Sequence, residues 1–394
     1  MAPVLLGPGP KAPPPLPEHV LEEIFLRIAS PADLARASAA CASFRRLTAD
    51  PAFLRRHRSL HPPLLLGFLD PRPVGFLPAG EPHPNAPVAR SLDGAADFSF
   101  DHIPRRGRRG WAPCDARDGR ILLLRPERGV VFPELAVCDP LSRDYALLPP
   151  IPDSLVASVL VQVKDEHIDS FEPFLLPSGD YEETQFSVIG WTHCEAKAVV
   201  FAYSSVSGSW TVGASAYWDA LGLNVQPEGL PPDWWPSYAY GCFYWKVASA
   251  DKLLKLDINR MEFSVVDLPP NHQNHDVAVV EAGEGRLGMF SHIVDFANPK
   301  PLCYFIRQNE SQNANEDQME ATIPLPQDYC FHITGASEGY IFLIGTQLVN
   351  DRSRAFFSVD IKTFKVERVC STSFGCSHIH PYFGFPPFMS PRRI

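Results

Sequence analysis

The chain has 394 residues, of which 45% are hydrophobic, so it is long enough for two or three domains with substantial cores. Its formal net charge of -10 is unevenly spread, because residues 131–394 carry 17 basic and 32 acidic side chains. This acidic excess argues against a nucleic-acid surface in that part of the chain. It mildly favours a basic partner, although the simpler interpretation is that it keeps a large domain soluble.

The cysteine and hydropathy patterns are those of an intracellular protein. Nine cysteines are scattered singly with no Cys-x-x-Cys pair, which is typical of free thiols in a reducing compartment. The opening residues hold only a four-residue apolar run, too short for the core of a signal peptide, and no later stretch approaches the length of a membrane span. We expect the protein in the cytoplasm, the nucleus or both, without membrane attachment.

Residues 16–60 predict three short helices behind a Pro-rich tail, residues 1–15, which we expect to be disordered. Pro17 stands at the start of the first helix, where a missing N–H costs nothing. Ser30 and Asp50 indicate the N-caps of the second and third helices. Because helices this short cannot bury all of their apolar positions among themselves, the segment implies a partner.

Ten residues of this segment form a pattern whose order along the chain makes it a specific signal. They are Leu16, Pro17, Ile24, Phe25, Leu34, Cys41, Asp50, Pro51, Phe53 and His57. With this pattern the segment resembles the F-box family, although Phe44 stands where the family usually has Trp and Ala40 where it usually has Val. The alternative interpretation is an ordinary helical cap of a larger domain.

The F-box resemblance implies that an apolar helix face docks on the Skp adaptor of a Skp-cullin-F-box ubiquitin ligase. The residues that it implies for this contact are Leu16, Pro17, Val20, Leu21, Ile24, Phe25, Leu34, Cys41, Phe44, Leu47 and Pro51. The resemblance also implies that the C-terminal domain holds the protein to be ubiquitylated, so that the chain bridges this substrate to the adaptor and, through it, to a cullin. Ubiquitin transfer would occur on other subunits, and we expect no catalytic residue and no cofactor here.

The rest of the chain changes from an irregular segment to a repetitive all-β pattern. Residues 61–110 are interpreted as a Pro-rich linker with one strand at 64–69, and residues 111–394 as one β domain. A unit recurs from about residue 115 onward: an apolar strand that ends in Asp or a similar turn residue, then a turn, then an aromatic or bulky residue.

The spacing of these units predicts a β-propeller. The aromatic positions Tyr145, Trp210, Phe263 and Phe364 stand 65, 53 and 101 residues apart, the last interval being about two units. We expect about six blades, with residues 64–69 and 374–388 completing one of them. The fold class is therefore multidomain, α plus all-β, with a β-sandwich as the alternative for the second domain.

Two segments of this domain carry a second resemblance. Residues 138–143, Cys-Asp-Pro-Leu-Ser-Arg, and the closing residues 381–387 resemble the kelch-like, F-box-associated β-propeller of plant F-box proteins.

Catalytic and metal-binding motifs are absent at the correct spacing. The sequence has no Gly-rich phosphate loop, no Gly-x-Ser-x-Gly and no His-Glu-x-x-His. Two histidine pairs, His272 with His275 and His378 with His380, lack a cysteine or carboxylate at ligand spacing. We interpret them as exposed loop residues and expect no metal.

A run of aromatic residues and prolines at 232–240 is the candidate for substrate recognition. The prolines argue against a central strand and favour an exposed loop, in which Trp234, Trp235 and Tyr238 would form a recognition surface. The alternative is that Trp234 and Trp235 pack back onto the blades as core.

Together these features predict a non-catalytic substrate-recognition adaptor of a Skp-cullin-F-box ubiquitin ligase. The alternatives are a binding protein outside any ligase and a propeller lectin or enzyme.

Overall fold

The computed structural model describes most of the chain: residues 16–29, 31–71, 74–104, 109–127, 129–160, 168–177, 185–194, 196–223, 236–248, 250–307, 317–349, 353–372 and 379–384. The predicted N-terminal tail, residues 1–15, lies outside this set. The described residues form two compact units, residues 16–63 and residues 64–384. Within them, none of the helices is both long and apolar enough to cross a membrane.

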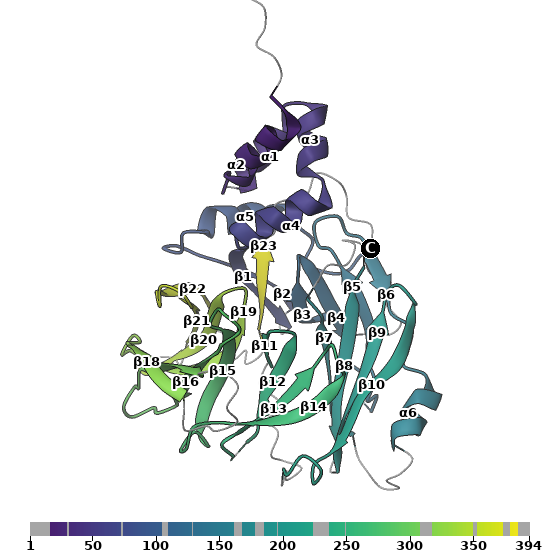
Figure 1. The fold of residues 1–394 in the computed structure, drawn as a ribbon, viewed down its shortest axis with the longest axis vertical. Coiled ribbons are helices and arrows are strands. Elements are labelled where there is room, and N and C mark those ends of the chain that lie inside the picture. Colours follow the sequence, from purple (N-terminus) through teal and green to yellow (C-terminus); the bar gives the residue numbers. More distant parts are fainter. Residues whose placement is uncertain are drawn as a thin grey trace, which may run out of the picture. The chain divides into compact units, whose positions relative to one another are not determined.

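The first unit is built from four short helices (Figure 1). They are α1 (Glu18–Leu26), α2 (Pro31–Ala39), α3 (Ala42–Thr48) and α4 (Pro51–Leu60). The second helix expected from the sequence is divided into α2 and α3, because the backbone of Cys41 is extended, with φ -159° and ψ 164°. Asp50 caps α4 as expected: its side chain accepts hydrogen bonds from the N–H groups of Ala52 (2.8 Å) and Phe53 (3.2 Å).

One apolar cluster and two histidines hold these helices together. The cluster consists of Phe25, Leu26, Leu34, Leu47, Phe53 and Leu54. On α4, Nε2 of His57 donates to the carbonyl oxygen of Ile28 (2.9 Å), and Nε2 of His61 donates to that of Leu26 (2.7 Å). Carbonyl groups at a helix C-terminus lack intrahelical donors, so these contacts satisfy groups that would otherwise be costly to bury.

The second unit is a β-propeller of six sheets (Figure 1), which confirms the predicted architecture. Blade 1 is a three-stranded sheet in the order β2 (Val74–Pro78), β1 (Leu64–Pro71), β23 (His380–Gly384). Blade 2 contains β3 (Ala112–Arg117), β4 (Arg120–Arg125), β5 (Glu134–Cys138) and β6 (Tyr145–Leu147). Blade 3 contains β7 (Ile168–Leu175), β8 (Ser187–Cys194), β9 (Lys197–Ser204) and β10 (Ser209–Tyr217).

The last three blades follow the same order along the chain. Blade 4 contains β11 (Ser237–Ala239), β12 (Cys242–Lys246), β13 (Lys252–Asp257) and β14 (Glu262–Asp267). Blade 5 contains β15 (His275–Glu281), β16 (Leu287–Ile293), β17 (Leu302–Arg307) and β18 (Asp317–Ile323). Blade 6 contains β19 (Tyr329–Ser337), β20 (Tyr340–Gln347), β21 (Arg354–Asp360) and β22 (Val366–Thr372).

The two ends of the propeller segment meet in blade 1. Strand β1 pairs antiparallel with both β2 and β23, so the ring is closed by a strand from each end of the segment. The linker interpretation of residues 61–110 therefore differs from the structure, in which residues 64–78 supply two blade strands. Along the chain, helix α5 (Ala86–Ala95) follows these strands, and helix α6 (Asp153–Leu160) comes after the last strand of blade 2 and before the first strand of blade 3.

The recurring sequence unit is the hairpin between the third and fourth strands of a blade. In blades 2, 4 and 6 it begins with an Asp whose carboxylate accepts two backbone N–H bonds from the next turn residues; these are Asp139, Asp257 and Asp360. Four positions later the backbone has a positive φ, at Arg143 (62°), Met261 (51°) and Phe364 (56°). In blade 3, Ser204 and Gly208 (φ 65°) take the same two places.

Three of the four aromatic positions found in the sequence join a blade to the preceding one. The indole Nε1 of Trp210 donates to the carbonyl oxygen of Pro149 (2.7 Å), which follows blade 2. The ring centroid of Phe263 lies 5.7 Å from that of Trp191, and the centroid of Phe364 lies 5.3 Å from that of Tyr304. Tyr145 is the exception, being 39% exposed.

Candidate functional site

Helix α1 and the residues before it present two apolar stripes at helical spacing. The inner stripe, Leu21, Phe25 and Ile28, packs in or against the apolar cluster of the helical unit. The second, which we call the outward stripe, consists of Leu16, Val20 and Ile24. Leu16 is 53% exposed and Ile24 is 41% exposed, while Val20 is half-buried. A row of large apolar side chains left in water is the kind of surface that a partner covers.

The residues expected at the Skp contact fall into three environments. Leu16, Pro17, Ile24 and Cys41 are exposed, Val20, Leu21 and Phe44 are half-buried, and Phe25, Leu34 and Leu47 are buried. Pro51 is the first residue of α4, and its side chain lies outside the described set. Since the buried three hold the helices together, the surface available to a partner is the outward stripe with its exposed neighbours.

Charged groups fix the orientation of α1 from another side of the helix. Arg56 on α4 forms ion pairs with Glu22 (2.6 Å) and Glu23 (2.9 Å). These contacts raise the pKa of Arg56, with the hydrogen bond to Glu23 as the largest cause. Exposed pairs of this kind add little stability, so we assign them the role of positioning the helix.

Residues Cys41 and Phe44 occupy the junction between α2 and α3. The exposed thiol of Cys41 is 3.1 Å from the hydroxyl of Ser43, and this hydrogen bond lowers the pKa of the thiol. The ring of Phe44 packs edge-on against Phe25 at a centroid distance of 5.0 Å. Phe44 therefore contributes to the helical core as well as to its surface.

The aromatic run proposed for substrate recognition is only partly described. Trp234 and Trp235 lie outside the described residues. Tyr238 lies in strand β11 rather than in an exposed loop, and its half-buried ring packs 5.0 Å from that of Phe243. A strand is possible here because Pro236 precedes β11 and so removes no ladder hydrogen bond.

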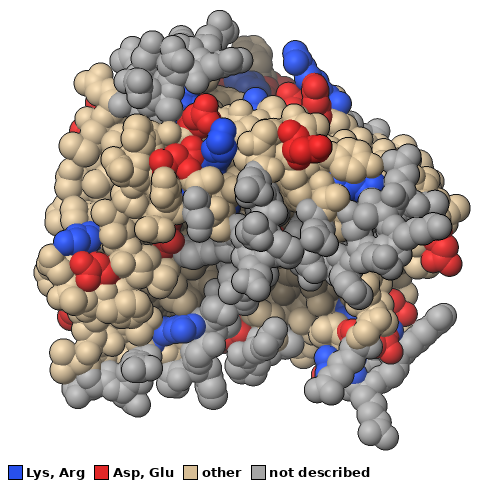
Figure 2. Space-filling model, turned by 90° about the horizontal axis from the view of Figure 1, so that it is seen from below, with Lys and Arg blue, Asp and Glu red and all other residues tan. Residues whose placement is uncertain are grey.

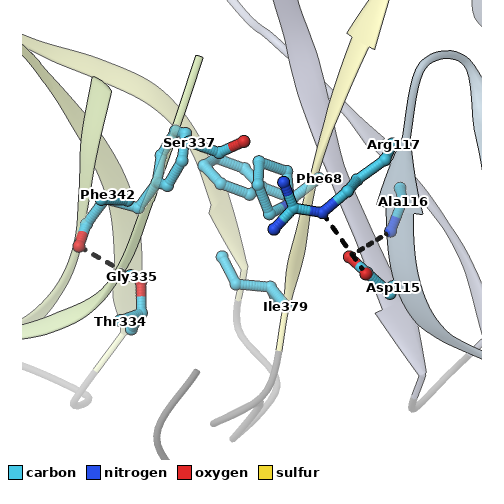
Figure 3. A pocket seen from close by; sticks show the side chains of 11 residues that line it. Phe68, Asp115, Ala116, Arg117, Thr334, Gly335, Ser337, Phe342 and Ile379 are labelled. Atoms are coloured by element: carbon cyan, nitrogen blue, oxygen red, sulfur yellow. Dashed lines mark hydrogen bonds and ion pairs between the residues drawn. The ribbon is translucent and has the colours of Figure 1, made fainter. Parts of the chain in front are cut away.

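The centre of the propeller holds a cavity that the sequence analysis did not anticipate. The cavity is small: the space that water can occupy in it is about 20 Å³. It is lined by strands β3, β19 and the start of β23, with one aromatic residue each from β1 and β20. Its principal lining residues are Phe68, Asp115, Arg117, Ser337, Phe342 and Ile379 (Figure 3). These strands belong to blades 2, 6 and 1, which meet at the centre of the ring.

Asp115 and Arg117 are the charged residues of this lining. Asp115 is 1% exposed, and its two carboxylate oxygens accept hydrogen bonds from the N–H groups of Ala116 (2.7 Å) and Leu175 (2.8 Å). Burial raises the pKa of Asp115, while Arg117 and the two N–H donors act in the opposite direction. Arg117 Nε lies 3.7 Å from Asp115 Oδ2, within ion-pair range.

The guanidinium group of Arg117 extends toward blade 4. Its Cζ atom lies 5.3 Å from the ring centroid of Tyr238 and 5.9 Å from that of Phe243. The Arg117 side chain is only 13% exposed, so these cation–π contacts operate in a largely desolvated setting. Tyr238 therefore supports the cation at the centre of the propeller.

The histidines are more buried than the sequence analysis expected. His272 is 7% exposed and His380 is 5% exposed, whereas His378 lies outside the described residues. His275 is half-buried and its Nδ1 lies 2.7 Å from the hydroxyl of Ser291. Among the described residues, no three His, Cys, Asp or Glu side chains are grouped so that they could hold a metal ion.

The charge distribution on the surface is mixed. Figure 2 shows the described Lys and Arg side chains interspersed with Asp and Glu over the face in view. This face has no extended region of one sign among its described residues, although the chain as a whole is acidic.

Comparison with known proteins identifies the N-terminal segment. Residues 15–61 match the F-box-like family. No curated protein matches the chain.

Solved structures give matches at low identity. An exo-β-1,3-galactanase from Clostridium thermocellum is 13% identical, with a TM-score of 0.37, over 68% of this chain and 63% of that one. The exo-β-1,3-galactanase from Phanerochaete chrysosporium is 11% identical, with a TM-score of 0.38, over 73% of this chain and 70% of that one. The WD40 domain of SCAP from fission yeast is 8% identical, with a TM-score of 0.34, over 65% of this chain and 53% of that one. The chain thus covers less than two thirds of the first and the third, and nothing about activity follows from these similarities.

The helical unit, its family match and the six sheets lead to one description: the chain carries an F-box-like domain at its N-terminus, followed by a six-bladed β-propeller.

Proposed function

We propose that this chain is the substrate-recognition subunit of a Skp-cullin-F-box ubiquitin ligase and that it has no catalytic residue of its own. The observation that carries the proposal is the F-box-like match of residues 15–61, in a unit that leaves Leu16 and Ile24 exposed. In this proposal the outward stripe is desolvated against the helices of the Skp adaptor. At about 25 cal/mol per Å² of apolar surface, a few such side chains are enough to decide the affinity.

The propeller is the part that would hold the client protein. It has its own apolar clusters, separate from the cluster of the helical unit, so a ligand on one unit need not disturb the core of the other. Holding a client near the ubiquitin-charged enzyme raises its effective concentration, which is the contribution of a bridging subunit. Ubiquitin transfer itself takes place on other subunits, which join through the cullin.

We also propose a structural class for the propeller and a location in the cell for the whole protein. The Asp-initiated hairpins of blades 2, 4 and 6 support the kelch-like, F-box-associated class found in plant F-box proteins. A chain working with cullin-based ligases belongs in the cytoplasm, the nucleus or both.

The deciding experiment is co-expression of the full chain with a Skp adaptor, followed by gel filtration and measurement of Kd. Ile24→Asp places a charge on the outward stripe, so we expect the affinity to fall at least about 100-fold, given the cost of burying an unpaired carboxylate. Leu60→Asp is the matched control, because Leu60 is also apolar and 59% exposed but lies on α4.

The two variants separate the possible outcomes. A stable complex that Ile24→Asp abolishes and Leu60→Asp retains supports the proposal. If the wild-type chain forms no complex with the adaptor, or if Ile24→Asp binds as tightly as wild type, the ligase role is refuted.

A further inference from the structure

Two neighbouring blades of the propeller expose four large apolar side chains. In blade 5, Ile293 ends β16 and is 41% exposed, and Phe296 in the loop that follows is 59% exposed. In blade 6, Leu348 and Val349 follow β20 and are 36% and 68% exposed. We call these four residues the blade 5–6 patch. Single exposed apolar side chains are common on proteins, whereas a group of them marks a surface that a partner covers.

The loop of blade 5 contacts the first strand of blade 6. The ring of Phe296 packs edge-on against His332 of β19, with a centroid distance of 6.5 Å. The neighbouring backbone N–H of Asp295 donates to the thiol of Cys330 on the same strand. The β16–β17 loop therefore lies along the first residues of β19.

The loop of blade 6 begins beside the same residues. The N–H of Leu348 donates to the carbonyl oxygen of Asp328 (3.0 Å), the residue directly before β19. Asp328 and Cys330 are two positions apart, which is at most about 7 Å of chain. Both loops join the second strand of a blade to the third, so they lie at the same end of the propeller. The four apolar side chains thus belong to one region of the surface.

A carboxylate without a described counter-charge borders this patch. Asp328 is exposed, and no described Lys or Arg side chain pairs with it. The charge of Asp295 is compensated, because its Oδ2 lies 3.6 Å from Nζ of Lys300. Arg354 of blade 6 is on β21, which β20 separates from β19. Asp328 therefore gives the border of the patch a negative charge.

The apolar area and the carboxylate together select one kind of partner. A large apolar side chain that covers Phe296 and Val349 removes their exposed surface from water. An exposed ion pair adds little affinity by itself, but like charges placed opposite each other are unfavourable, so Asp328 decides which sign of charge the partner carries. The excess of 32 acidic over 17 basic side chains in residues 131–394 adds to this preference.

We propose that the blade 5–6 patch binds a segment of the client protein in which a large apolar residue stands next to Lys or Arg. The apolar side chain packs on Phe296 and Val349, and the cationic group pairs with Asp328. This inference rests on the proposed function, in that the client is the protein held for ubiquitylation. It assigns that client a chemical class: a protein with an accessible segment that is both apolar and basic.

The test is affinity selection of peptides on the immobilised full chain, read by mass spectrometry. The probes are N-acetylated, C-amidated octapeptides with Gly and Ser at the ends and four randomised central positions, so they carry no terminal charge. We expect peptides that join a large apolar residue to Lys or Arg to be enriched at least about tenfold over those that join the same residue to Asp or Glu.

Variants connect this selection to the patch. Phe296→Asp should lower retention about tenfold or more, because the apolar contact is lost and a charge would be buried unpaired. Val206→Asp is the matched control, since Val206 is 69% exposed in the turn between β9 and β10, at the opposite end of the propeller. All seven tryptophans lie between residues 111 and 245, so intrinsic fluorescence verifies that each variant propeller is folded.

A charge reversal tests the role of Asp328. Asp328→Lys should invert the selection, so that peptides with Asp or Glu beside the apolar residue are enriched over those with Lys or Arg. Asp93→Lys is the control, because Asp93 is also an exposed aspartate that pairs with no described Lys or Arg, and it lies on α5. A folded Asp328→Lys variant that still prefers basic peptides overturns the inference.

The remaining outcomes separate this inference from its alternatives. No selection, equal enrichment of basic and acidic peptides, or unchanged retention by a folded Phe296→Asp also overturns it. A dimer of the wild-type chain in gel filtration that Phe296→Asp dissociates would assign the patch to a second copy instead of a client. Absence of peptide selection with the adaptor complex intact refutes this inference alone, whereas peptide selection without an adaptor complex refutes the ligase role alone.

Discussion

Burial decides which side chains of the helical unit are available to a partner. Residues Ile24 and Phe25 are neighbours in sequence and both apolar, yet Ile24 is 41% exposed and Phe25 is 5% exposed. A step of one residue along a helix turns the side chain by about 100°, which separates the outward stripe from the core. Both residues belong to the F-box pattern, but in the fold Phe25 packs in the core while Ile24 is available to a partner.

Burial also changes the proton affinity of histidines in the propeller. His292 on β16 is 2% exposed, and its Nδ1–H donates to the carbonyl oxygen of Pro301 at 3.3 Å. Burial lowers the pKa of His292, and it lowers those of His83 and His275 in the same way. Because an unfolded histidine titrates at about pH 6.5, the unfolded chain binds the proton first as the pH falls through this value.

We therefore expect the free energy of unfolding of the propeller to decrease between about pH 7 and about pH 5.5, and His292→Gln to reduce this decrease. Urea unfolding followed by tryptophan fluorescence at the two pH values measures the difference. His19→Gln, at an exposed position of α1, is the control and should leave the decrease unchanged. A decrease of the same size in His292→Gln would contradict the assignment.

At the scale of elements, the closing blade depends on a glycine. Strand β1 has an irregular register at Leu65 and Gly67 where it pairs with β23. A Cβ atom on Gly67 would lie 2.2 Å from the carbonyl oxygen of Leu77 on β2, and the φ of Gly67 is +152°. Only glycine allows the two backbones to approach this closely.

Gly67→Ala should therefore destabilise the propeller by roughly 3 kcal/mol, because the clash is with backbone that cannot rotate away. Gly75→Ala is the matched control on β2, where nothing lies within 4 Å of the added Cβ. The midpoint of urea unfolding by tryptophan fluorescence gives both values. Equal midpoints for the two variants would show that blade 1 closes in another way.

At the scale of the whole molecule, the chain has two compact units with separate apolar cores. Separate cores predict separate stabilities, because each core can be lost cooperatively within its own unit. The seven tryptophans report on residues 111–245 alone, so fluorescence follows the propeller while adaptor binding follows the helical unit.

We expect Ile24→Asp to leave the fluorescence midpoint of unfolding unchanged while it weakens adaptor binding. Conversely, Gly67→Ala should lower the midpoint and leave the Kd for the adaptor within about twofold of wild type, since Gly67 and the outward stripe belong to different compact units with separate apolar cores. A shift of the midpoint by Ile24→Asp would show that the two units are energetically coupled.

The sequence alone determined the features that depend on local patterns. Apolar residues at helical spacing and the cap at Asp50 predicted the helical unit, and the recurring Asp-turn-aromatic unit predicted a propeller of about six blades. These features are readable because a hairpin turn or a helix cap is fixed by residues within a few positions of each other. The closure of the ring was also predicted, from apolar segments at the two ends of the β domain.

Only the tertiary structure decided which residues meet at the centre of the ring. Arg117 stands directly before an Asp-Gly turn, and none of its neighbours in the sequence indicates that it lines a cavity. Ser337 and Ile379, which line the same cavity, are more than 200 positions away in the chain. His272 and His380, expected in exposed loops, are buried. The surroundings of a side chain in a propeller depend on segments far away in the sequence, so the local sequence does not predict its burial.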